Sequence, residues 1–108
     1  MDLLRRLTEN GISAEDLCEQ WDRLRGLALR DTLTDLHTLR SLLETQQDAL
    51  LHNKPVLGAT RWFVSEVVAL GDDCFAAIME DGHAENCIVF RYDGDSIKVL
   101  IESPPEVP

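Results

Sequence analysis

Residues 60–102 read TRWFVSEVVALGDDCFAAIMEDGHAENCIVFRYDGDSIKVLIE, and this segment decides the fold of the chain. Its apolar, β-branched and aromatic residues fall into four runs, as is typical of β-strands. Between the runs stand residues that favour tight turns: Gly71-Asp72-Asp73, Asp81-Gly82 and Asp93-Gly94-Asp95. We therefore predict four antiparallel strands, joined as a meander, at about 60–70, 74–80, 84–92 and 97–102.

The residues before this segment have the apolar spacing of helices. Asn10-Gly11 ends a first helix, Ser13 is suited to cap a second, and Pro55 ends a third. We predict helices over about 2–10, 14–26 and 32–52. Helices followed by a meander indicate an α+β fold, with two or three N-terminal helices packed on a C-terminal four-stranded antiparallel sheet.

The turns also predict which residues face each other across the sheet. A two-residue loop at Gly94-Asp95 pairs Tyr92 with Ile97, and the same register pairs Ile88 with Ile101. For the first hairpin, the sequence is compatible with two registers. If Leu70 lies opposite Phe75, Trp62 and Glu66 point to the core face; if Ala69 does, both point to the opposite face.

Both faces of the predicted sheet are apolar. A two-residue loop at Asp81-Gly82 pairs Phe75 with Ile88 on the core face. The opposite face carries Cys74, Ala76, Ile78, Cys87, Val89 and Leu100. An antiparallel sheet usually keeps one polar face toward water. Either helices flank both sides, or the second face meets another subunit or a partner; we favour the interface, because large apolar patches mark binding sites.

From this interpretation we predict a protein-binding surface that comprises Trp62, Val64, Glu66, Ile78 and Val89. Trp62, Phe63 and Trp21 are the aromatic anchors to test first, because Trp is enriched at binding hot spots. Each of the three also fits an ordinary core position. If Trp62→Ala unfolds the isolated domain, an interface role for Trp62 has no support.

Glu66 interrupts an otherwise apolar strand. If the strand is covered, burial favours the neutral carboxyl group, which can act as a general acid or base. If the strand lies at an edge, Glu66 is simply solvated. No Ser/His/Asp order, Gly-rich phosphate loop or cofactor fingerprint accompanies it. We predict no cofactor, and no catalytic residue other than Glu66 under the alternative of an enzyme.

The chain has 108 residues and a net charge of −10 at pH 7. This length suits one domain, which we place at 1–103, with a frayed tail at 104–108. The acidity argues against direct binding of nucleic acid. Solubility alone accounts for such a charge, and a protein partner with a basic surface is the alternative interpretation. No apolar run is long enough to cross a membrane, and the N-terminus does not have the pattern of a signal peptide. We predict a cytoplasmic protein.

The cysteines are Cys18, Cys74 and Cys87. Their odd number and the lack of a CxxC spacing predict neither a disulfide framework nor a zinc motif. We expect Cys74 and Cys87 to be small buried residues on strands. The histidines at 37, 52 and 83 lack metal-ligand spacing, and the turn aspartates lack the pattern of a calcium loop. No metal site is predicted.

Two stretches, VSEVVALGDDCFAA at 64–77 and IVFRYDGDSI at 88–97, resemble the C-terminal meander of NTF2/SnoaL-like proteins. That family places helices before such a sheet, encloses a cone-shaped pocket, and often dimerises through the outer sheet face. The resemblance covers residues 60–102. It implies a homodimer that binds a small molecule or acts as a hydrolase or isomerase, and it assigns no catalytic residue.

The sequence therefore predicts a non-enzymatic, small acidic protein-binding module: an inhibitor, adaptor or immunity-type protein that acts through an apolar sheet face and an acidic surface. The alternative is an NTF2-like small-molecule binder, hydrolase or isomerase in which Glu66 is the acid or base. A third hypothesis is a homodimer subunit with a purely structural role.

Overall fold

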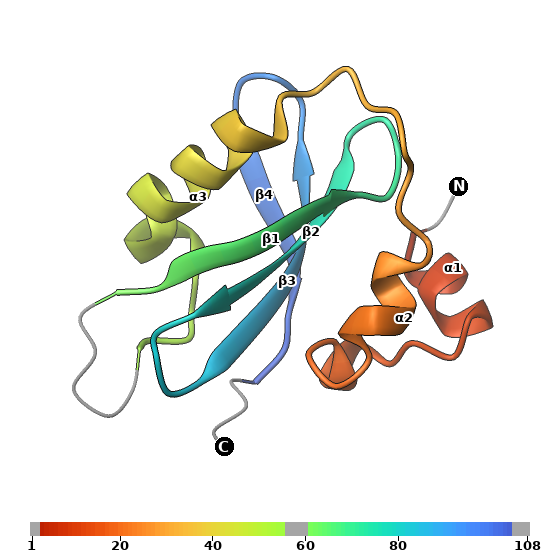
Figure 1. Ribbon diagram of the computed structural model, residues 1–108, viewed down its shortest axis with the longest axis horizontal. Coiled ribbons are helices and arrows are strands. Elements are labelled where there is room, and N and C mark those ends of the chain that lie inside the picture. The colour runs from red at the N-terminus through yellow and green to blue at the C-terminus, as the bar shows by residue number, and fades with distance from the viewer. Residues whose placement is uncertain (1–2, 56–60, 105–108) are drawn as a thin grey trace.

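The computed structural model describes residues 3–55 and 61–104, and these form three layers (Figure 1). The middle layer is a four-stranded antiparallel sheet in the order β1-β2-β3-β4. The helix α3 packs on one face, and short N-terminal helices pack on the other. The predicted α+β architecture with a C-terminal meander is confirmed. Residues 2 and 60 and most of the predicted frayed tail lie outside the described residues.

The helical elements are α1 (Leu3–Glu9), the 3-10 helix η1 (Ala14–Asp16), α2 (Trp21–Arg25) and α3 (Leu36–Leu50). The strands are β1 (Phe63–Ala69), β2 (Cys74–Glu80), β3 (Glu85–Tyr92) and β4 (Ile97–Glu102). The strand positions follow the predicted turns closely. Gly82 and Gly94 have φ angles of 95° and 96°, which side-chain-bearing residues rarely adopt, so these turns are marked in the sequence.

α3 covers the first face of the sheet. Leu39 and Leu43 lie one helical turn apart and pack against Phe75, Ile88 and Phe90. All five side chains are at most 1% exposed. The apolar spacing of the helix and the alternation of the strands therefore meet in one core, as the sequence predicts.

α3 begins later than the sequence predicts. Its cap is Asp35, whose side chain accepts hydrogen bonds from the amides of His37 at 2.9 Å and Thr38 at 3.4 Å. Thr32, the predicted start, lies outside the helix. The predicted start at residue 32 is therefore about one turn too early.

Residues 14–26 do not form the single helix that their apolar spacing predicts. η1 is a short 3-10 turn, and α2 begins only at Trp21. Gln20 holds the break, because its side chain accepts a hydrogen bond from the amide of Ser13 and donates one to the carbonyl of Gly11, both at 2.7 Å. Leu17 and Trp21 both pack toward the sheet, where they are 1% and 5% exposed.

The second face of the sheet is covered by these N-terminal elements. The buried side chains of this N-terminal layer are Leu7, Ile12, Leu17, Trp21 and Leu24. Burial of a large apolar side chain contributes about 1.5–3 kcal/mol, so five of them bind the layer firmly to the sheet. Our preference for an open interface on this face is therefore corrected. The preference assumed that the helices cover one face only, whereas residues 3–29 form a layer of their own.

The first hairpin follows the second of the two predicted registers only in part. Ala69 lies opposite Phe75, and Glu66 lies opposite Ile78. Between Val64 and Glu66 the register shifts, so that Ser65 is the extra residue of a β-bulge. The bulge reverses the facing of the residues before it. Glu66 therefore faces the N-terminal layer, whereas Trp62 and Val64 join the core under α3.

The last hairpin also contains a bulge. Tyr92 pairs with Ile97 as predicted, but Ile88 lies opposite Glu102 and not opposite Ile101. The extra residue is Leu100, and the bulge turns Ile101 toward the N-terminal layer.

In the middle hairpin the loop is longer than predicted. Four residues, 81–84, connect β2 to β3, so that Glu80 pairs with Glu85. Phe75 consequently faces Phe90, where a two-residue loop would have paired it with Ile88. The side chain of Asp81 accepts hydrogen bonds from the loop amides of His83 and Ala84 at 2.8 and 2.7 Å. A shift of two residues leaves every side chain on its predicted face.

Candidate functional site

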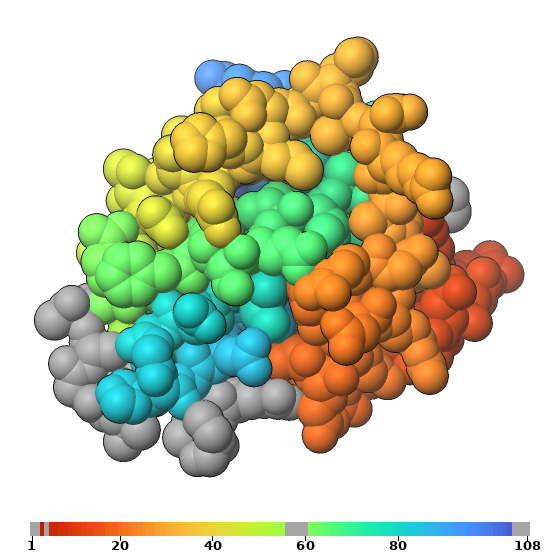
Figure 2. All heavy atoms as spheres, in the orientation of Figure 1, coloured from red at the N-terminus to blue at the C-terminus, as the bar shows by residue number. Residues whose placement is uncertain are grey.

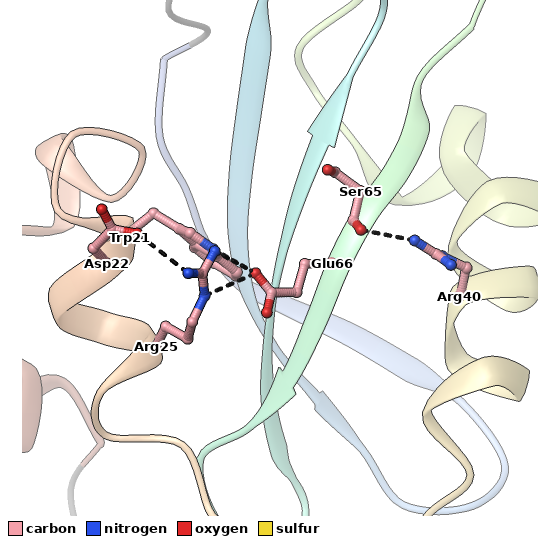
Figure 3. A network of polar contacts seen from close by, with 6 residues as sticks. All are labelled: Trp21, Asp22, Arg25, Arg40, Ser65 and Glu66. Carbon is pink, nitrogen blue, oxygen red and sulfur yellow. Dashed lines mark hydrogen bonds and ion pairs between the residues drawn. The ribbon is translucent and has the colours of Figure 1, made fainter.

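The bulge of β1 lies where the two helical layers meet the edge of the sheet (Figure 3). On one side Trp21 and Arg25 of α2 point toward the carboxylate of Glu66. On the other side Arg40 of α3 reaches the backbone carbonyl of Ser65, at 2.7 Å. Figure 2 shows β1 in green at the surface, between α3 in yellow and the N-terminal layer in orange. One short stretch of strand therefore joins both helical layers.

The side chain of Glu66 is half-buried, and one of its carboxylate oxygens makes several polar contacts. Its Oε1 accepts hydrogen bonds from the indole Nε1 of Trp21 and from Nε of Arg25, both at 3.0 Å. Nη2 of Arg25 completes an ion pair at 2.7 Å, and Asp22 lies 3.4 Å from Nη1 of the same guanidinium. The side chain of Glu66 is 36% exposed. These contacts are those of a structural ion pair that fixes α2 to the sheet.

Three side chains of α3 pair with the backbone at the start of β1. Gln47 accepts a hydrogen bond from the amide of Trp62 at 2.7 Å and donates to its carbonyl at 3.0 Å. Glu44 accepts from the amide of Val64, and Arg40 donates to its carbonyl, both at 2.8 Å. These bonds occupy positions that an added strand would need, so this part of the edge is closed to another chain.

A groove of about 310 Å³ opens beside the bulge, between α2 and the sheet. We call it the acidic groove. It is lined by Cys18, Glu19, Trp21, Asp22, Arg25, Ser65, Glu66, Ile78 and Glu85. Four carboxylates and one guanidinium give the lining a formal charge of −3. Because its walls come from the turn before α2, from α2 itself and from three strands, the acids are held at a concave surface.

Two further hollows flank this region. One, of about 280 Å³, lies on the α3 side of the bulge and is lined in part by His37, Arg40 and Val67. The other, of about 600 Å³, lies at the turn between β1 and β2 and includes Arg6 and Cys74. Burial, followed by the neighbouring carboxylate of Asp73, raises the pKa of the Cys74 thiol. A reactive thiolate is therefore disfavoured at Cys74.

Four of the five predicted protein-binding residues are buried inside the chain. Trp62 is 1% exposed, Val64 5%, Ile78 7% and Val89 0%, so none of these side chains offers a binding surface in this fold. Glu66 borders two hollows, and the nearly buried Ile78 contributes to the lining of the acidic groove. The sequence interpretation missed Glu19, Asp22 and Glu85 as groove residues. The density of acids between residues 15 and 22 was a signal for Glu19 and Asp22, but the sequence held no such signal for Glu85.

The predicted aromatic anchors also divide into buried and exposed residues. Trp62 and Trp21 are buried, and each indole N–H has an internal acceptor: the carbonyl of Asn53 for Trp62 and Glu66 for Trp21, both at 3.0 Å. Phe63 is 53% exposed, with the guanidinium carbon of Arg61 5.5 Å from its ring centre. Of the three anchors, Phe63 alone is largely exposed, whereas Trp21 only contributes to the lining of the acidic groove.

Cys18 and Cys87 form a disulfide, with 5.5 Å between their Cα atoms. The expectation of no disulfide, with Cys87 as a plain buried residue, is corrected on this point. The spacing of the cysteines carried no signal, because a bond between residues 69 positions apart depends on the tertiary fold. The bond joins the N-terminal layer to the middle of β3, directly across the covered face.

Among residues 3–55 and 61–104, no three His, Cys, Asp or Glu side chains gather as metal ligands. In the same ranges, no helix is both long and apolar enough to span a bilayer.

Comparison with known proteins found no match: no protein family, curated protein or solved structure is similar to this chain at a significant level. The resemblance to NTF2/SnoaL-like proteins therefore stays a prediction.

Proposed function

We propose that this chain is a small acidic protein-binding module, an inhibitor, adaptor or immunity-type protein, and that its acidic groove receives a basic segment of the partner. The groove is the observation that supports this proposal. It combines a concave shape with a formal charge of −3, on a chain whose net charge is −10. Charge complementarity of this kind steers association and selects the partner.

The occupant that fits is an arginine- or lysine-bearing stretch of a protein. Glu19, Asp22 and Glu85 are exposed and border the groove, so they can reach the head groups of such side chains. Glu66 and Arg25 already neutralise each other in part. The acid–base alternative gains no support from this arrangement, because Oε1 of Glu66 is held by two donors.

A defined basic probe tests the proposal. Fluorescence anisotropy would follow a labelled tetra-arginine peptide as the chain is added, at low and at physiological salt. We expect binding that weakens as salt rises, because the Debye length falls from about 30 Å at 0.01 M to about 8 Å at 0.15 M. The double variant Glu19→Gln/Glu85→Gln should bind several-fold more weakly.

The matched control is Asp48→Asn/Asp95→Asn, which changes the net charge equally at two exposed acids outside the acidic groove. It should lose much less affinity than the groove variant. Equal losses in both double variants would show that only net charge matters, and the groove would then have no role.

The proposed location is the cytoplasm, as the sequence predicts. Thiols in the cytosol are kept largely reduced, so we expect Cys18 and Cys87 to be thiols in the resting cell and to join under oxidation. Alkylation before lysis, followed by mass analysis, tests this. A bond that is complete in unstressed cells would contradict a cytoplasmic location.

The homodimer expected from the sequence is a separate proposal. The sheet face on which it rested is covered by the N-terminal layer, so any dimer would need another surface. Sedimentation at micromolar concentration decides it: a single species of 12.2 kDa would remove the homodimer.

A further inference from the structure

The two cysteines of the Cys18–Cys87 disulfide differ in their exposure to solvent. Cys87 is 0% exposed, at the centre of the cluster between β3 and the N-terminal layer. Cys18 is half-buried, in the turn between η1 and α2, and lines the acidic groove. Of the two sulfur-bearing residues, only Cys18 borders open space within the described part of the chain.

Ser103 covers another side of the bond. Its hydroxyl lies 3.7 Å from Sγ of Cys18 and donates to the carbonyl of Cys87 at 3.3 Å, and its side chain is buried. A thiolate that attacks a disulfide must reach one sulfur while the other leaves. With Cys87 enclosed and Ser103 on one flank, the acidic groove is the approach to Cys18.

The charge of the acidic groove affects which thiols reach Cys18. The groove lining carries four carboxylates and one guanidinium. A concave acidic surface raises the local concentration of cations and lowers that of anions, with effects on association rate of about tenfold or more at low salt. An attacking thiolate brings its own negative charge, so a second anionic group on the reagent is disfavoured and a cationic group is favoured.

We propose that Cys18–Cys87 is a thiol–disulfide exchange site that reacts through Cys18 with cationic and neutral thiols in preference to anionic ones. This inference does not require a protein partner in the acidic groove.

The exchange is a balanced two-step reaction. A thiolate RS⁻ forms a bond to Sγ of Cys18, the protein S–S bond breaks, and its electron pair leaves on Sγ of Cys87, which takes up a proton. A second RS⁻ attacks the reagent sulfur of the mixed disulfide, releases Cys18 as a thiolate and forms RSSR. Two thiols are oxidised, and the protein disulfide is reduced by two electrons. A disulfide RSSR of the same charge class reverses the sequence.

The N-terminal layer stays in place after reduction, because other contacts hold it. The guanidinium of Arg6 donates to the carbonyls of Leu70 and Leu27, and the amide of Leu29 donates to Ala69 at 2.8 Å. Reduction therefore changes the stability of the layer without unfolding the chain, and the site can cycle.

Three thiols of similar size test the charge preference: cysteamine, 2-mercaptoethanol and 2-mercaptoethanesulfonate. The oxidised full chain is exposed to each thiol and the reaction is quenched with N-ethylmaleimide. Intact-protein mass spectrometry then gives the rate of reduction, which is divided by the thiolate concentration. The same rates on the chain unfolded in urea supply the intrinsic reactivity of each thiol. We expect the folded chain to favour cysteamine over the sulfonate by about tenfold at 0.01 M salt. The preference should nearly vanish at about 1 M salt, where the Debye length is near 3 Å.

A matched pair of variants locates the effect. Glu19→Gln/Glu85→Gln should reduce the cysteamine preference, whereas Asp48→Asn/Asp95→Asn should leave it close to that of the unchanged chain. Equal normalised rates for the three thiols in the folded and unfolded chain would overturn the proposal. So would a preference that both double variants reduce equally. If the variants fold poorly, the salt series on the unchanged chain decides alone.

Discussion

Ser65 and Leu100 hold matching positions on the two outer strands: each is the extra residue of a β-bulge. The ladder between the inner strands runs from Cys74↔Arg91 to Glu80↔Glu85 without a shift. A bulge bends its strand and hinders pairing with a further strand, so both edges of the sheet are guarded. On β1 the bulge also sends Glu66 and Val64 to opposite faces, which lets one strand serve both cores.

Insertion of one alanine between Val64 and Ser65 should unfold the chain or lower its free energy of unfolding by roughly 4 kcal/mol or more. With a bulge of one extra residue, the added residue shifts the residues before it by one pairing position and turns them to the wrong face, including Trp62 and Val64. Ser65→Ala is the control, because Arg40 binds the backbone carbonyl of this residue and not its hydroxyl. Urea denaturation should show a loss below about 0.5 kcal/mol for the control. Similar losses for the two changes would contradict the assigned bulge.

The ion pair at Glu66 predicts that this residue has a structural role, which the NMR spectrum of the Trp21 indole can report. Glu66→Ala should lower the free energy of unfolding by about 1 kcal/mol, a modest value because the pair is partly exposed. In the NMR spectrum, the indole N–H resonance of Trp21 should shift and that of Trp62, bonded to Asn53, should not. Glu66→Gln keeps an acceptor and should shift the Trp21 resonance less. A Trp21 resonance that is unmoved by Glu66→Ala would refute the contact.

The disulfide predicts a stability difference between the oxidised and the reduced chain. Its closure of a long loop, over a separation of 69 residues, should contribute about 2–4 kcal/mol. Urea denaturation with and without a neutral reductant measures this difference. Cys74→Ala is the control, because Cys74 is not part of the bond and its replacement leaves the oxidised–reduced difference in place. Identical urea midpoints with and without reductant would mean that the bond does not form in solution.

Asp35 predicts a specific pH dependence. The hydroxyl of Thr38, then the amides of His37 and Thr38, donate to its carboxylate and hold its pKa below the ordinary value of 3.8. A folded-state pKa below the unfolded one adds stability above the unfolded pKa, and that stability is lost as the pH falls through the folded pKa.

The test is a comparison of wild type with Asp35→Asn across pH. The stability gap between the two should be constant at neutral pH and should shrink below about pH 4. A gap that is the same at every pH would show that the charge of Asp35 does not contribute to the cap of α3.

Local chemistry explains what the sequence could predict. The strands follow from apolar runs between turn residues, and Gly82 and Gly94 mark turns through their positive φ. The core around Leu39, Phe75 and Phe90 follows from the 3.6-residue and two-residue periods of helix and strand.

What the sequence could not predict depends on contacts between distant residues. The bulge at Ser65 is settled by the helices on either side of β1, and the break before Trp21 is held by the bonds of Gln20. The pairing of Cys18 with Cys87 and the acids that border the groove come together only in the folded chain. For this reason the predicted site residues, chosen from strand patterns, were mainly core residues.

NMR mapping of the basic probe on the ¹⁵N-labelled chain tests the central claim, that the acidic groove is the binding surface, most directly. The tetra-arginine peptide would be added stepwise at low salt while the amide resonances are followed. The shifts should concentrate at Glu19, Asp22, Glu66 and Glu85, and they should disappear in the Glu19→Gln/Glu85→Gln variant. Shifts spread evenly over the exposed acids, with Asp48 and Asp95 moving as much as the groove residues, would contradict it.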